Sequence, residues 1–229
     1  MKINEKEIGS GSDVFIIAEL SANHNGSLET ALQTIQAAKR AGADCIKLQT
    51  YTADTITIDS QKEDFVIKGT IWDGKNYYEL YKEAYTPWEW HSALFKEAEK
   101  QGLICFSSPF DKTAVDFLET FNVPAYKIAS FEITDIPLIE YVASKGKPII
   151  ISTGMANLNE IDLAYKTAEK NGAKEVTLLY CVSNYPSQST DFNLNYIEEF
   201  IDKEFSSLRI DFSLIKFNGF SDLDKKYFP

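Results

Sequence analysis

Six short apolar segments of this sequence end in charged, amide or hydroxyl side chains that could bind a small anion. In chain order these polar residues are Glu19, Lys47 with Gln49, Ser107 with Ser108, Lys127 with Ser130, Ser152 with Thr153, and Ser183 with Tyr185. Lys47 and Gln49 are two positions apart, so in a strand their side chains project from the same face. A lysine in a partly dehydrated site acts as a compact positive charge for phosphate or carboxylate groups. The pattern therefore predicts a small, highly charged anionic substrate.

Two carboxylates accompany these residues. Glu19 ends the apolar segment IIAEL, and Glu132 lies two positions after Ser130. Either carboxylate could orient hydroxyl groups, position a water molecule or take part in proton transfer.

Each of these residues also has a structural interpretation. A lysine at a strand end is often a surface residue or a partner in a structural ion pair, and Glu19 could interact with the N-terminus of the next helix. His24, in the loop SANHNG, is expected to brace that loop through backbone contacts rather than to act as a ligand.

The segments around these residues alternate between β-branched runs and helical periodicity. Strands are expected at 14–20, 45–50, 104–110, 125–130, 148–154 and 176–183. Helices are expected at 27–42, 87–102, 111–121, 135–146, 158–172 and 193–205. Regular alternation of strand and helix implies a parallel sheet with right-handed crossovers.

An open doubly wound sheet and a closed (β/α)8 barrel both fit this alternation. An open sheet gathers its ligand groups at one switch point, whereas a barrel brings every strand end to one mouth. Polar residues at all of the strand ends favour the barrel, and the glycine-rich nucleotide-binding motifs are absent from the sequence.

The length predicts a barrel that is incomplete at its C-terminus. The sixth strand–helix unit ends near Phe205, and the remaining residues offer one more strand, whereas a complete barrel needs roughly 250 residues. We therefore expect about six to seven units in a single partial domain spanning 1–229. The connection 51–85 adds no obvious unit, and loops of this length are often functional covers.

Composition excludes several classes of protein. The net charge of -11 argues against a nucleic-acid partner. We find no apolar run near the roughly 18 residues that span a membrane and no signal peptide, so we expect a cytoplasmic protein. Cys45, Cys105 and Cys181 are odd in number, far apart and each within an apolar run, which predicts buried reduced thiols rather than disulfides or a zinc site.

Several motifs occur in a fixed order between about 14 and 200. They are contained in IIAELSANHNGSLETALQTIQAAKRAGADCIKLQTYT, FSSPFD, YKIASFE, IISTG and CVSNYP. Together they resemble the sialic acid synthase family of nonulosonic acid synthases. Within that family, ELSANH, KLQTYTADTITIDS, KEDFVIKGTIWDG and TPWEWH most resemble the pseudaminic acid synthases.

The resemblance implies a barrel enzyme that condenses phosphoenolpyruvate with an open-chain N-acetylated amino sugar and releases phosphate. For a pseudaminic acid synthase the sugar is a diacetamido-trideoxy-altrose, and the product serves surface glycans. N-Acetylneuraminate and legionaminate synthases are the alternatives within the family. A further alternative is a non-catalytic remnant that binds phosphoenolpyruvate or associates with a full-length synthase.

The resemblance also implies roles for individual residues. Positions that bind phosphoenolpyruvate or complete its pocket match Lys47, Ser108, Lys127, Ser130, Ser152, Ser183 and Tyr185. Gln49 matches a supporting polar position, Glu19 a carboxylate near the attacked carbon and its water, and Glu132 a carboxylate that holds the sugar.

The family implies a divalent metal, Mn²⁺ or Mg²⁺, held by two histidines, which would polarise the sugar aldehyde. Here Gly219-Phe220-Ser221-Asp222 is followed by Leu223 where the first histidine is expected. We therefore expect both metal ligands to be missing, together with the last strand and the C-terminal antifreeze-like domain of family homodimers.

A stability hypothesis follows from the incomplete barrel. Two unpaired sheet edges would invite edge-to-edge association. We expect the isolated chain to be marginally stable or to form oligomers.

Overall fold

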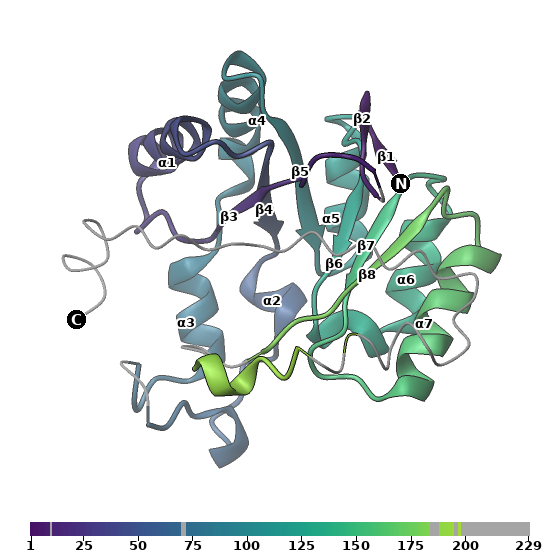
Figure 1. The fold of residues 1–229 in the computed structure, drawn as a ribbon. Helices are drawn as coiled ribbons and strands as arrows, with labels where there is room; N and C mark the ends of the chain where they lie inside the picture. The colour runs from purple at the N-terminus through teal and green to yellow at the C-terminus, as the bar shows by residue number, and fades with distance from the viewer. Residues whose placement is uncertain (10, 70–71, 184–187, 195–196, 198–229) are drawn as a thin grey trace.

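A computed structural model of the chain describes residues 1–9, 11–69, 72–183, 188–194 and 197. Its main sheet is parallel and six-stranded, and each strand pairs with the next one along the chain (Figure 1). The strands are β3 (Ile17–Ser21), β4 (Cys45–Thr50), β5 (Ile104–Pro109), β6 (Tyr126–Ile128), β7 (Ile149–Ser152) and β8 (Val176–Leu179). Sequential pairing without a switch point is the strand order of a barrel, so the expected α/β barrel-type sheet is confirmed.

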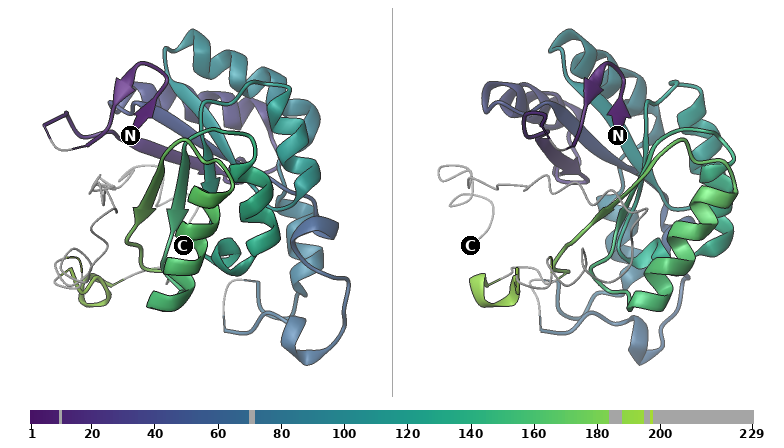
Figure 2. Two further views of the ribbon diagram at one scale, coloured as in Figure 1. Left: turned by 90° about the vertical axis from the view of Figure 1, so that its right-hand side faces the viewer. Right: turned by 45° about the vertical axis from the view of Figure 1, so that its right-hand side comes forward.

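Five helices cover one face of this sheet (Figure 2). They are α1 (Leu28–Arg40), α4 (His91–Lys100), α5 (Lys112–Glu119), α6 (Ile136–Ala143) and α7 (Leu158–Lys170). Ser27 is the N-cap of α1, since its hydroxyl accepts a hydrogen bond from the Thr30 N–H at 3.2 Å. α4 begins later than expected, since a short 3-10 helix, η2 (Trp88–Trp90), occupies its first turn. The expected helix at 193–205 lies almost wholly outside the described residues.

The strands alternate strictly between two environments. In β4, Ile46 and Leu48 pack among apolar residues of α1 and α4, whereas Cys45 packs with Phe106 and Ile150 on the opposite, inner face of the sheet. Side chains two positions apart share a face, so Lys47 and Gln49 belong to the inner face with Cys45. Both residues therefore lie on the side of the sheet that faces the barrel interior.

A β-hairpin that the sequence did not predict closes the N-terminal end of the inner face (Figure 1). It pairs β1 (Lys2–Ile3) with β2 (Lys6–Glu7) in antiparallel fashion. Ile3 is fully buried among the inner apolar residues. The Lys2 N–H donates a hydrogen bond of 2.8 Å to Glu175 Oε2, close to the start of β8. The hairpin leaves only the C-terminal ends of the strands for a polar site.

The connection 51–85 contains local structure that its sequence did not indicate. The elements are α2 (Ala53–Ile56), the 3-10 helix η1 (Glu63–Phe65) and α3 (Tyr77–Ala84). Non-local contacts hold them, including a hydrogen bond of 2.9 Å from the Tyr78 hydroxyl to Asp54 Oδ1. α2 and α3 lie beyond the C-terminal ends of β3 and β4 (Figure 1).

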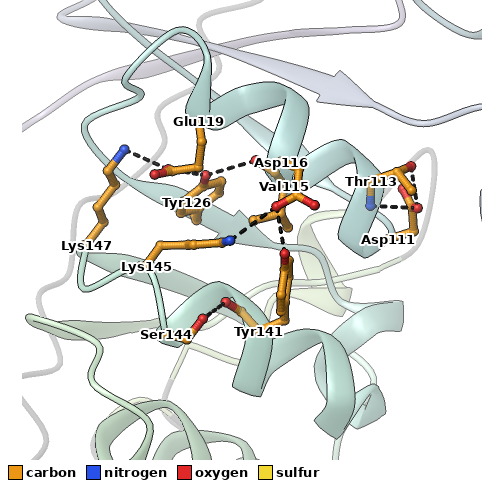
Figure 3. Close-up of polar contacts among 10 residues, drawn as sticks. All are labelled: Asp111, Thr113, Val115, Asp116, Glu119, Tyr126, Tyr141, Ser144, Lys145 and Lys147. Atoms are coloured by element: carbon orange, nitrogen blue, oxygen red, sulfur yellow. Dashed lines mark hydrogen bonds and ion pairs between the residues drawn. The ribbon is translucent and has the colours of Figure 1, made fainter.

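A polar network ties the outer face of β6 to its covering helices (Figure 3). Glu119 Oε1, on α5, accepts hydrogen bonds from the Tyr126 hydroxyl at 2.6 Å and from Lys147 Nζ at 2.7 Å. Asp116 Oδ1 accepts one from the Tyr141 hydroxyl of α6 at 2.7 Å. The network joins α5 to β6, to α6 and to the turn before β7.

Cys45 and Cys105 are buried free thiols, as expected, whereas Cys181 is a free thiol that is only partly buried. Burial raises the pKa of Cys45 and of Cys105, which keeps both thiols protonated. Within the described residues, we find no helix that is both long and apolar enough to cross a membrane.

Candidate functional site

The inner face changes from apolar to charged between the N-terminal and C-terminal ends of the strands. Near the hairpin it presents Ile17, Cys45, Phe106 and Ile150. Two residues further along the chain come Glu19, Lys47, Ser108 and Ser152. Strand pairing sets Glu19 beside Lys47 and Gln49 beside Ser108. The barrel mouth therefore carries a layer of polar side chains above a closed apolar floor.

Lys47 is held between two groups from the end of β3. It is 6% exposed, and its Nζ lies 3.4 Å from Glu19 Oε1 and 3.4 Å from Ser21 Oγ. The register of β3 against β4 shifts between Glu19 and Ser21. Because of this irregularity Ser21, two positions beyond Glu19, still reaches Lys47.

Lys127 supplies the second buried ammonium group. It is 4% exposed, and it donates hydrogen bonds to the Ile128 carbonyl at 2.7 Å and to the Ser152 hydroxyl. Burial and, second to it, the positive charge of Lys47 lower the pKa of Lys127 to about 8. Like charges away from water disfavour each other's charged form, and an anion bound near both ammonium groups would offset that cost.

Glu132 lies in the 3-10 helix η3 (Phe131–Thr134), directly after β6. Burial raises the pKa of this carboxyl group to about 7. Its Oε2 atom and the Ser108 hydroxyl are buried and find no hydrogen-bond partner within the described residues. Buried polar atoms without partners are uncommon in native proteins, and here a polar ligand in the mouth would satisfy them.

Ser130 and Ser183 converge on the backbone of Gly154, just beyond β7. A Cβ atom placed on Gly154 would lie 3.3 Å from Ser130 Oγ and 2.9 Å from the Cys181 carbonyl, and closer still to Ser183 Oγ. No larger residue fits there without displacing these groups, so the ends of β6, β7 and β8 pack around a required glycine.

The structure thus brings together most of the residues that the sequence predicted for the site. Those with described positions at the mouth are Glu19, Lys47, Gln49, Ser108, Lys127, Ser130, Glu132, Ser152 and Ser183. Tyr185 and Leu223 lie outside the described residues. The individual roles of these residues remain predictions.

Sequence reasoning overlooked Ser21 and Thr86. Ser21 lies in the motif ELSANH, two positions after Glu19 and so on the same face, but only the register shift, which pairs Ser21 with Leu48, brings it close to Lys47. Thr86 is fully buried, and its Oγ1 atom lies 3.1 Å from His24 Nε2. The motif TPWEWH contained the only signal for Thr86, and nothing in it indicates a contact with the end of β3.

The two histidines of the chain do not fit a metal site. His24 Nδ1 accepts the Gly26 N–H at 3.2 Å, and its Nε2 faces Thr86. His91 Nε2 lies 2.9 Å from Thr50 Oγ1. The structural interpretation of His24 is confirmed by these contacts. In the part of the chain that the structure describes, no three His, Cys, Asp or Glu residues cluster closely enough to hold a metal ion.

Comparison with known proteins places this site in a family. The NeuB family model matches residues 34–222. The chain is 52% identical over 184 residues to pseudaminic acid synthase of Campylobacter jejuni, covering 80% of this chain and 54% of that protein. It is 50% identical over 179 residues to pseudaminic acid synthase of Helicobacter pylori, covering 78% of this chain and 53% of that protein.

A solved structure agrees with the sequence comparison. The crystal structure of N-acetylneuraminic acid synthetase from Leptospira borgpetersenii, in complex with citrate, superposes with a TM-score of 0.78 at 31% identity. The match covers 92% of this chain and 67% of that one. The chain spans about half the length of the curated relatives it matches. This chain belongs to the NeuB family of sialic acid synthases, and within it the chain is most like the pseudaminic acid synthases.

Proposed function

We propose that the barrel mouth binds phosphoenolpyruvate and condenses it with an N-acetylated amino sugar, as the final carbon–carbon bond-forming step toward pseudaminic acid. The observation that carries this proposal is the pair of buried lysines, Lys47 and Lys127, in one polar layer with two carboxylates. Glu19 offsets part of this positive charge, and a phosphate and a carboxylate on one small molecule would supply further negative charge to the two ammonium groups.

The reaction joins the methylene carbon of phosphoenolpyruvate to the aldehyde carbon of the sugar. Water adds to the carbon that bears the phosphate, and phosphate leaves as its C–O bond breaks. Lys47 and Lys127 hold the anion, and the hydroxyls of Ser108 and Ser152 donate to its oxygens. Holding both carbons in contact supplies much of the rate enhancement.

Glu19 and Glu132 take part in different proton transfers. Glu19 beside Lys47 is placed to orient the attacking water and to accept its proton. Glu132 has a pKa of about 7, so near neutral pH it can bind a sugar hydroxyl and exchange a proton with the sugar oxygen. Both histidines are engaged by neighbouring residues, so neither is offered as a ligand for a divalent cation.

The proposed sugar is inferred from sequence similarity to relatives of known name. Identity near 50% to two pseudaminic acid synthases favours a diacetamido-trideoxy-altrose. The structural relative at 31% identity makes the amino sugar used by an N-acetylneuraminate synthase the second candidate.

Calorimetric titration with phosphoenolpyruvate tests the proposal. Lys127→Met and Lys47→Met are each expected to weaken binding at least tenfold, because each removes one of the charges that face the anion. Lys166→Met is the matched control, since Lys166 pairs with Asp162 on the exposed surface of α7. Equal affinity in all four proteins would contradict an anion site between the lysines.

Phosphate release in the presence of each candidate sugar then separates the functional alternatives. Release that depends on the diacetamido sugar supports a pseudaminic acid synthase. Binding of phosphoenolpyruvate without release supports the non-catalytic alternative.

A further inference from the structure

One short segment, 86–91, contacts the ends of both strands that carry the Glu19–Lys47 pair. The Thr86 hydroxyl donates to the Ser21 carbonyl, at the end of β3, over 3.3 Å. Trp88 Nε1 donates to the Tyr51 carbonyl, just after β4, over 3.2 Å. His91 Nε2 contacts Thr50, the last residue of β4. The segment thus spans two neighbouring strand ends from outside the ligand layer.

The hydrogen bonds at the β3 end have a fixed direction. The Gly26 N–H donates to His24 Nδ1, so this nitrogen carries no proton and Nε2 carries it. The Nε2–H therefore donates to Thr86 Oγ1 at 3.1 Å. The Thr86 hydroxyl, having accepted this bond, donates its own proton to the Ser21 carbonyl.

We call the hydrogen bonds that link His24, Thr86 and Ser21 the relay, and buried neighbours hold it in place. His24 is 1% exposed and Thr86 is fully buried. The Trp90 ring meets the His24 ring edge-on, with centroids 5.2 Å apart. Burial lowers the pKa of His24, so the imidazole is neutral, as the direction of the hydrogen bonds requires.

The relay ends on a residue in an unusual backbone conformation. Ser21 has φ of 51°, in the left-handed region that non-glycine residues rarely adopt. Such a conformation persists where neighbouring contacts determine it. In this conformation Ser21 Oγ lies 3.4 Å from Lys47 Nζ, on the same side as Glu19.

We propose that Thr86 and His24 are positioning residues, whose hydrogen bonds hold Ser21 left-handed so that Glu19 and Ser21 both face Lys47. The relay acts on Lys47 through Ser21. The inference rests on the proposed function for the identity of the ligand, but the position of Lys47 can be measured without one.

The test compares Thr86→Val with Thr86→Ser. Valine keeps the size and branching of threonine and removes the hydroxyl, whereas serine keeps the hydroxyl. Thr177→Val is the control, because Thr177 is also buried and contacts Met1 Sδ at the opposite end of the sheet. Each variant is examined by ¹⁵N and ¹³C NMR of its imidazole and lysine side chains, with Lys47 assigned through Lys47→Arg.

In Thr86→Val we expect the Lys47 side-chain resonances to move and the affinity for phosphoenolpyruvate to fall about tenfold. In Thr86→Ser and Thr177→Val we expect the Lys47 resonances and the affinity to stay at the wild-type values. With two histidines in the chain, the His24 signals also report directly that Nε2 carries the proton in the wild-type protein.

Unchanged Lys47 resonances in a folded Thr86→Val protein would overturn the proposal, since a lower melting temperature alone reflects only a structural contact. If Thr86→Val does not fold, His24→Asn replaces it, because asparagine is too short to bridge Gly26 and Thr86. If the wild-type chain binds no phosphoenolpyruvate, the proposed function fails, and the Lys47 resonances still decide whether the relay positions this residue.

Discussion

The pKa values of Lys127 and Glu132 are both shifted toward neutral pH. Burial lowers the pKa of Lys127 to about 8 and raises that of Glu132 to about 7. Between these values the ammonium is charged and the carboxyl group is mostly ionised. Groups with such values cluster in sites that bind charged ligands or transfer protons.

The affinity for phosphoenolpyruvate is expected to fall as the pH rises above about 8, where Lys127 loses its proton. If phosphoenolpyruvate binds only when Lys127 is protonated, the affinity falls about tenfold for each pH unit above that value. Titration calorimetry between neutral and alkaline pH measures this slope. Lys127→Met is expected to lose the slope, and a wild-type affinity that is flat across the range would count against a role for this ammonium.

At the scale of the element, β6 shows how a strand separates binding from stability. Its three residues alternate, so Tyr126 points to the outer network of Figure 3 and Lys127 points to the barrel mouth. Both side chains are almost completely buried. Of these two neighbouring residues, Tyr126 therefore contributes to stability, and we expect Lys127 to contribute to ligand binding.

Tyr126→Phe is expected to lower the free energy of unfolding by about 1.5 kcal/mol, because it removes a hydrogen bond to the Glu119 carboxylate. The affinity for phosphoenolpyruvate should not change. Lys127→Met should instead lose phosphoenolpyruvate binding. Its melting temperature should stay at or above that of the wild type, because removing a buried charge removes its desolvation cost. Denaturant unfolding and calorimetry on the two variants check this contrast, which a loss of binding in Tyr126→Phe would refute.

At the scale of the whole molecule, the polar mouth costs stability. Glu132 has a pKa near 7 in the folded protein and 4.5 as its ordinary value. A raised carboxyl pKa means that the folded state binds the proton more tightly than the unfolded state. The contribution of Glu132 to stability is therefore most favourable below pH 4.5 and is lost as the pH rises through about 7.

Glu132→Gln is expected to raise the free energy of unfolding by about 3 kcal/mol at pH 8, because the buried charge is removed. The gain should shrink as the pH falls and vanish near pH 4.5. Taking the difference between variant and wild type cancels the other titrating groups, including His91, whose pKa burial lowers to about 4. Urea unfolding at several pH values measures the difference, and a gain that does not depend on pH would exclude this account.

Association through sheet edges also belongs to this scale. Among the described residues, β3 and β8 each pair on one side only. The expectation that the isolated chain associates stays a prediction, which light scattering at several protein concentrations would check.

The sequence by itself determined the six strands of the main sheet and most of the strand residues that face the mouth. The boundaries of β4 match its prediction, because a β-branched, alternating run with polar residues at its end is a local signal. The same local signals placed Glu19, Lys47, Lys127 and Ser152 at strand ends. Resemblance of the motifs then identified the family, since ordered motifs along most of the chain are more specific than any single one.

Only the tertiary structure decided how these residues are held. The hydrogen bond from Thr86 to Ser21 joins residues 65 positions apart, and the hairpin of β1 and β2 is stabilised by burial of Ile3 under the sheet. Short elements such as α2 form because packing partners far along the chain offset their conformational entropy. The shift in register after Glu19 has no signature in sequence periodicity, and yet it places Ser21 against Lys47. The sequence therefore determined most of the residues that reach the mouth, and long-range contacts decided their geometry.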